Sequence, residues 1–143
     1  RGRRVDVAYT LRIPSGRWTD TTDIVVELAP ELRIAGTAAD GTYLLGPLTG
    51  GARDMDPTIT FTAAGVTDVT VEDVESGQWV RFAGDVTGPV VLDPRALTAT
   101  VGGAPVAALL DFSPRAMHLS PSAILRLARN GSQTVTVTAR RSY

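Results

Sequence analysis

The chain has 143 residues, a length that suits one domain and allows a hydrophobic core without disulfides or a structural metal. It contains no cysteine, which excludes a disulfide framework and any thiolate site. Fourteen basic residues against 15 acidic ones leave a formal net charge of −1, which argues against binding to nucleic acid or to an anionic membrane. No run of about 18 apolar residues predicts a membrane-spanning helix.

The clearest strand pattern lies near the N-terminus, in the segment VDVAYTLRI at residues 5–13. Its apolar side chains alternate with polar or small ones, as a half-buried strand requires. The apolar positions are Val5, Val7, Tyr9, Leu11 and Ile13. Because the chain starts with arginine and not with methionine, we expect it to be the C-terminal part of a longer protein.

The next stretch, TDIVVELAPELRI, allows two interpretations. A helix could begin after Thr22, but Pro30 and the adjacent β-branched residues Val25 and Val26 disfavour its extension. The shorter segment DIVVELA also fits a strand.

Short alternating segments continue along the rest of the chain and predict strands. They are TITFTA, VTVEDV, QWVRFAG, PVVLD, ALTATV, AMHLS and QTVTVTAR. Clusters of Gly, Pro, Asp and Ser separate them, and each cluster can reverse the chain. These clusters include GPLTGG, AAG, ESG, GDVTG, VGG, SPS and NGS. Many short strands with frequent turns predict an all-β antiparallel sandwich, in which we expect Ile59, Phe61, Leu92, Val135 and Val137 to be buried together with Val5, Val7 and Leu11.

The segment SAILRLARNG is ambiguous. Its composition suits a short helix that ends at Asn130-Gly131, but Asn-Gly between two apolar runs is also a strong hairpin signal. We favour the hairpin, in which residues 133–140 form a strand inside the sheet although they lie near the chain end.

Asp93 lies between PVVLD and ALTATV, in the sequence Asp93-Pro94-Arg95. Proline cannot donate a hydrogen bond to a sheet, so these residues predict a tight turn, and VGG predicts a second reversal that continues the meander. A catalytic role for Asp93 would need a base or nucleophile motif nearby, and none is present in the neighbouring sequence.

Other chemical candidates are sparse. His118 is the only histidine, so a metal site would need carboxylates for its other ligands, and no serine lies in a G-x-S-x-G motif. Six acidic residues are close enough in sequence to suggest Ca²⁺, but they lack the order of a calcium loop, and a solvated strand face explains them as well. They are Asp54, Asp56, Asp68, Glu72, Asp73 and Glu75. We therefore expect no catalytic residue, metal or cofactor.

Trp18 and Trp79 are the two tryptophans. An exposed indole on a sandwich can stack on a sugar ring, whereas a buried one serves the core. Both residues are therefore candidate carbohydrate contacts as well as candidate core residues.

The order of motifs resembles the C-terminal domain of the distal tail protein family of long-tailed phages, also called siphovirus-type tail component or minor tail protein. The resemblance rests on VDVAYTLRIPSGRW as an entry strand that leads to a proline and a tryptophan, and on GPLTGGARDMDPTITFTAAG as a glycine-rich link before an alternating strand. It rests further on VEDVESGQWVRFAGDVTGPVVLDPRALTATVGGAPV as a central signature, and on LSPSAILRLARNGSQTVTVTARRSY as the closing turn and strand. Ser122 and Ile124 depart from the Gly and Asn that the family favours after the proline, and Ser76 stands where the family has Thr.

This resemblance implies a galactose-binding-like, jelly-roll type sandwich formed by residues 1–143 as one domain. It implies a non-enzymatic structural component of a phage or prophage tail tip, with other tail proteins as partners and a homo-oligomeric ring, a hexamer, in the full-length protein. The alternative is a carbohydrate-binding module that contacts glycans on the host surface through Trp18 and Trp79.

Overall fold

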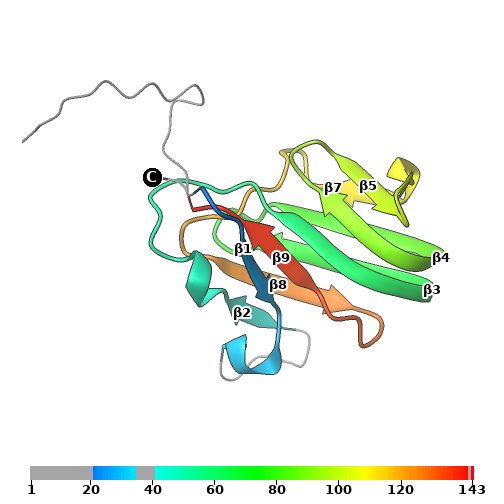
Figure 1. Cartoon of the computed structure of the whole chain (residues 1–143), viewed down its shortest axis with the longest axis horizontal. Coiled ribbons are helices and arrows are strands. Elements are labelled where there is room, and N and C mark those ends of the chain that lie inside the picture. Colours follow the sequence, from blue (N-terminus) through cyan, green and yellow to red (C-terminus); the bar gives the residue numbers. More distant parts are fainter. Residues whose placement is uncertain (1–20, 35–40, 142) are drawn as a thin grey trace, which may run out of the picture.

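Nine antiparallel strands make up about half of the part of the chain that the computed structural model describes, which is residues 21–34, 41–141 and 143 (Figure 1). The strands are β1 (Ile24–Glu27), β2 (Thr42–Leu44), β3 (Thr58–Asp73), β4 (Trp79–Asp93), β5 (Thr98–Val101), β6 (Ala104–Pro105), β7 (Leu110–Phe112), β8 (Ile124–Arg129) and β9 (Thr136–Ala139). No α-helix occurs in the described ranges. Their helical turns are of the 3-10 type: η1 (Pro30–Leu32), η2 (Gly46–Leu48) and η3 (Ala107–Leu109).

The strands β3 and β4 form one long hairpin that organises the whole fold. They pair without interruption from Ile59 opposite Leu92 to Glu72 opposite Trp79. The turn between them is closed by the N–H of Asp73, which donates to the carbonyl of Gln78 over 2.8 Å. The ESG cluster therefore reverses the chain, as the sequence predicts.

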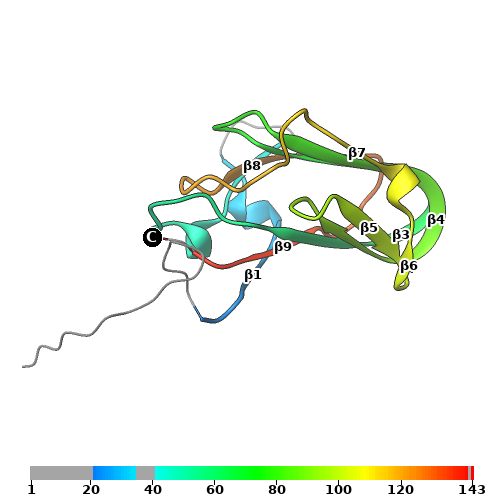
Figure 2. The same ribbon diagram turned by 90° about the horizontal axis from the view of Figure 1, so that it is seen from above.

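β3 and β4 each bend and continue from one layer into the other. Figure 2 shows the two layers joined where these long strands curve. In one layer the strand order is β1-β9-β3-β4-β5-β6. In the other layer β8 pairs with residues 69–73 of β3 and with β2, while β7 pairs with residues 80–82 of β4. The result is an antiparallel sandwich, so the all-β fold class expected from the sequence is confirmed.

Glycines allow the long hairpin to bend between the layers. Gly65 in β3 has a φ of +99° and Gly88 in β4 has a φ of +134°, values that side chains with a Cβ rarely adopt. Both lie within continuous strands, opposite Val86 and Ala63 respectively. The prediction that AAG and GDVTG reverse the chain is therefore wrong, because their glycines curve two strands without ending them.

The core fills the space between the two layers. Phe61 from one layer meets Phe82 from the other edge to face, with ring centroids 5.7 Å apart and an interplanar angle of 73°. Of the residues expected in the core, all five that the structure describes are at most 4% exposed, which confirms that part of the prediction: Ile59, Phe61, Leu92, Val135 and Val137. The strand expected at residues 5–13, with Val5, Val7 and Leu11, lies outside the described residues.

Two ambiguous segments are resolved as strands. Residues 24–27 form β1, followed by the turn η1, so no helix begins after Thr22. The segment SAILRLAR contains β8, as we favoured, but β8 and β9 do not form a hairpin. They pair with opposite halves of β3, because the chain between them crosses from one layer to the other. Of the strand expected at AMHLS, the structure contains only an isolated bridge between Leu119 and Met55.

The predicted final strand is confirmed inside the sheet, but it is shorter than the expected 133–140, because β9 comprises only Thr136–Ala139. β9 lies between β1 and β3, with Val137 opposite both Val26 and Ile59. Burial of Val135 and Val137 stabilises the fold by about 1.5–3 kcal/mol for each side chain. The meander is confirmed as well, since β4 pairs with β5 and β5 with β6.

Candidate functional site

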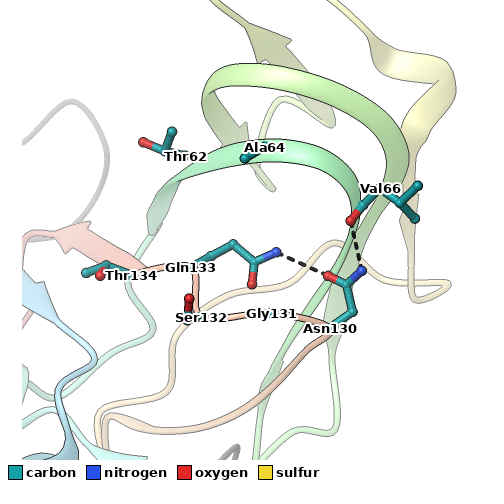
Figure 3. A pocket seen from close by; sticks show the side chains of 8 residues that line it. All are labelled: Thr62, Ala64, Val66, Asn130, Gly131, Ser132, Gln133 and Thr134. Atoms are coloured by element: carbon teal, nitrogen blue, oxygen red, sulfur yellow. Dashed lines mark hydrogen bonds between the residues drawn. The ribbon is translucent and has the colours of Figure 1, made fainter.

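A groove lies beside the bend of β3 in the described part of the chain. It has a volume of about 540 Å³. One wall is the outer side of β3 and the other is the connection between β8 and β9 (Figure 3). The lining side chains are all uncharged, and most are small: Thr62, Ala64, Val66, Asn130, Gly131, Ser132, Gln133 and Thr134. Val66 is 74% exposed, the highest value among the large apolar side chains described.

Asn130 ties one end of the groove to β3. Its Nδ2 donates to the carbonyl of Val66 over 2.9 Å, and its Oδ1 accepts from the N–H of Asp68 over 3.0 Å. The same Oδ1 accepts from Nε2 of Gln133 over 3.1 Å (Figure 3). The Asn-Gly pair, which we interpreted as a hairpin turn, therefore anchors the connection to the bent strand.

An ion pair lies next to Asn130, on the outer face of the layer that contains β7 and β8. Nη2 of Arg81 is 2.7 Å from Oδ2 of Asp68, and Nε of Arg81 donates to Oδ1 over 3.0 Å. This bidentate hydrogen bond from Arg81 lowers the pKa of Asp68 below its ordinary value. The outer face of this layer is thus charged and ion-paired, in contrast to the uncharged groove.

The six carboxylates considered for Ca²⁺ do not converge. No group of three or more His, Cys, Asp or Glu residues that could hold a metal occurs in the described ranges. Asp68 pairs with Arg81, Glu72 with Arg126, and Asp56 with His118. Glu75 and Asp54 are exposed.

Asp73 is the exception among them, because it is fully buried. Its Oδ2 accepts from Oγ of Ser120 over 2.5 Å and from Oγ of Ser76 over 2.7 Å. Backbone N–H groups of the same two serines donate to the carboxylate over 3.1 Å each. The carboxylate therefore joins the β3–β4 turn to the segment before β8, which is a structural role.

His118 forms a small polar cluster with Asp56 and Arg95. Its Nδ1 lies 2.9 Å from Oδ1 of Asp56, and Nη1 of Arg95 lies 3.6 Å from Oδ2 of the same carboxylate. The backbone N–H of His118 donates to Oε1 of Gln78 over 3.0 Å. The cluster links three chain segments that are distant in sequence.

Asp93 occupies a structural position at the end of β4, and Trp79 lies at the start of the same strand. Oδ1 of Asp93 accepts from the N–H of Ala96 over 3.2 Å and stabilises the turn that leads into β5, as the sequence predicts. Trp79 is only partly exposed, and its backbone N–H donates to Oγ of Ser113 over 3.1 Å. Trp18 lies outside the described residues.

No helical segment in the described ranges is long and apolar enough to cross a membrane.

Comparison with known proteins shows the fold. No protein-family model matches the sequence, and no curated protein matches it either. Among solved structures, the Dit protein of phage SPP1, described as a paradigm of the hub adsorption apparatus in phages that infect Gram-positive bacteria, matches 85% of this chain with a TM-score of 0.59 and 14% identity. The match covers 47% of that protein, so this chain spans about half of its length. A virus-like particle of the extra small virus of the giant freshwater prawn Macrobrachium rosenbergii matches with a TM-score of 0.34 and 16% identity over 97% of this chain and 91% of the viral chain, a likeness too low to carry an argument.

Proposed function

We propose that this chain is a non-enzymatic structural domain of a phage or prophage tail, located at the tail tip. The observation that carries the proposal is the shared fold with the SPP1 Dit protein over 85% of this chain at a TM-score of 0.59. The order of sequence motifs supports it independently, since it led to the same group of tail proteins.

The hydrogen bonds and ion pairs of the carboxylates support a structural role without catalysis. The carboxylate of Asp73 is satisfied by two serines, that of Asp68 by Arg81, and that of Asp56 by His118. Enzyme active sites instead place reactive groups in a cleft where a substrate can reach them. The groove beside β3 is lined only by uncharged side chains.

We also propose that residues 1–143 form one domain, the C-terminal part of a longer tail protein. A match to 47% of the SPP1 protein is compatible with this arrangement. In the longer protein, a separate segment would form a homo-oligomeric ring, a hexamer by family resemblance, and this domain would contact other tail proteins. Repeated head-to-tail contacts close into rings when the rotation between subunits allows it.

The assembly is tested by light scattering and negative-stain electron microscopy on two proteins, the complete gene product and the 143-residue chain. We expect rings from the complete product and monomers from the chain. A complete product that stays monomeric at micromolar concentration, or a chain that cleaves a glycan or peptide, would overturn the proposal.

Carbohydrate binding through Trp18 and Trp79 stays a prediction. A glycan array probed with the chain and with Trp79→Ala tests it. Retention of a glycan by the chain and its loss in the variant would support a carbohydrate-binding module.

A further inference from the structure

One side of β3 lacks a neighbouring strand along the bend. β4 pairs with the other side of β3 along residues 59–72. On the open side, β9 pairs with residues 58–60 and β8 pairs with residues 69–73. Residues 61–68 therefore have no second strand beside them in the described part of the chain, and the groove of about 540 Å³ occupies this position.

The gap arises from the different path lengths of two neighbouring segments. The connection between β8 and β9 comprises residues 130–135, whereas the accompanying segment of β3 comprises residues 61–68. The connection takes the shorter way between the layers, while β3 follows the curve around Gly65. Figure 3 shows the connection and the curved strand separating beyond Asn130.

The open edge of β3 presents main-chain hydrogen-bonding groups. Both main-chain groups of Asp68 point to this side, because its N–H donates to Oδ1 of Asn130 and its carbonyl accepts from the N–H of Asn130. The carbonyl of Val66 points the same way, because it accepts from Nδ2 of Asn130. Successive residues of a strand direct these groups to alternate sides, so those of Ala64 and Thr62 lie on the same open side. No strand in the described ranges pairs with them.

An unsatisfied side-chain acceptor lies in the opposite wall. Oε1 of Gln133 is buried and has no hydrogen-bond partner, although Nε2 of the same amide donates to Asn130. A buried polar atom without a partner is costly, and a ligand N–H removes this cost when the Gln133 amide turns toward the groove.

We propose that this gap binds a short extended peptide segment of another protein, which adds to the open edge of β3 as a strand. Main-chain groups at strand spacing on an open edge match the main chain of an extended peptide. Opposite residues 62–66 such a strand would be about 17 Å long at about 3.3 Å per residue. Because none of the eight lining residues is charged, the bound segment carries small uncharged side chains on the side that faces the connection.

The lining favours a peptide over a sugar, since the groove contains no aromatic side chain on which a sugar ring could stack. The inference does not depend on the proposed tail function, because any protein with this fold could use the open edge in the same way.

The test begins with a displayed library of random ten-residue peptides selected on the intact chain. The tightest peptide is synthesised with a fluorescent label, and its Kd is measured by anisotropy with the chain and with two variants. Val66→Arg places a bulky charge at the groove, and Val25→Arg is the matched control, because Val25 is a similarly exposed valine, 64% against 74%, on strand β1, which does not line the groove. We expect at least a tenfold weaker Kd for Val66→Arg and a change of less than twofold for Val25→Arg.

Amide hydrogen exchange measured by NMR locates the bound peptide. We expect exchange at Thr62, Ala64 and Val66 to slow at least tenfold when the peptide is present. If Val66→Arg lacks the far-UV spectrum of the chain, Ser132→Arg in the exposed connection replaces it. The proposal is overturned if no library peptide binds with a Kd below 1 mM, if groove variants bind as well as the chain does, or if protection appears elsewhere. Localisation of the protein in virions tests the tail function separately.

Discussion

Replacing Asp73 with alanine tests how the β3–β4 turn is held to the rest of the sandwich. The carboxylate is fully buried and accepts four hydrogen bonds from Ser76 and Ser120. Ser120 is only 4% exposed, so its N–H and hydroxyl would have no water to replace the carboxylate. Ser76 is exposed, so its two donors would become hydrated.

The expected loss follows from the two buried donors. Each buried donor left without a partner costs about 1–3 kcal/mol, and removal of a buried charge returns part of this through its lost desolvation penalty. We therefore expect Asp73→Ala to lower the free energy of unfolding by about 3 kcal/mol. A domain with a typical stability of about 5–15 kcal/mol would remain folded.

Urea denaturation followed by far-UV circular dichroism measures this loss. Ser76→Ala is the control, because it removes one hydroxyl from the same carboxylate at an exposed site, and we expect less than about 1 kcal/mol. A double-mutant cycle of Asp73→Ala with Ser120→Ala should show coupling. If Asp73→Ala is no more destabilising than Ser76→Ala, the buried carboxylate does not hold the turn.

Leu97 has a φ of +57°, so Leu97→Gly should be more stable than Leu97→Ala, which loses the same side-chain burial but keeps the strain, by up to about 1 kcal/mol, and a lower Tm for the glycine variant would contradict the strain. The lowered pKa of Asp68 means that its pair with Arg81 stabilises the fold fully above the ordinary value of 3.8 and loses its effect as the pH falls through the folded-state pKa. The stability deficit of Asp68→Asn measured at pH 7 should therefore disappear at the acid end of a urea series, and a deficit that persists there would argue against the pair. Truncation after Asn130 removes β9 from its place between β1 and β3, so the shortened chain should lack a cooperative melt, and a cooperative transition would refute that pairing.

The fold class could be predicted from the sequence because alternation reports local burial. The threonines around Ile59 and Phe61, and those around Val135 and Val137, face outward as the pattern indicates. The topology could not be predicted in the same way. Gly65 in AAG lies in a continuous strand, yet a glycine that bends a strand and one that reverses the chain give the same local signal.

The groove could not be predicted from the sequence for a related reason. Val66 and Asn130 meet at the groove although they are 64 positions apart, and neither belongs to a recognised binding motif. The Asn-Gly pair suggested a hairpin because its local chemistry suits one. Only the pairing of β8 and β9 with opposite halves of β3 opens the groove, and this depends on contacts across the whole chain.

Immunogold electron microscopy of virions tests the proposed tail function most directly. Antibodies raised against the 143-residue chain would be applied to particles produced by the host that carries the gene, with pre-immune serum as the control. The account predicts gold particles at the distal end of the tail. Label confined to the capsid, or label absent from intact virions while the protein is abundant in the host cell, would contradict it.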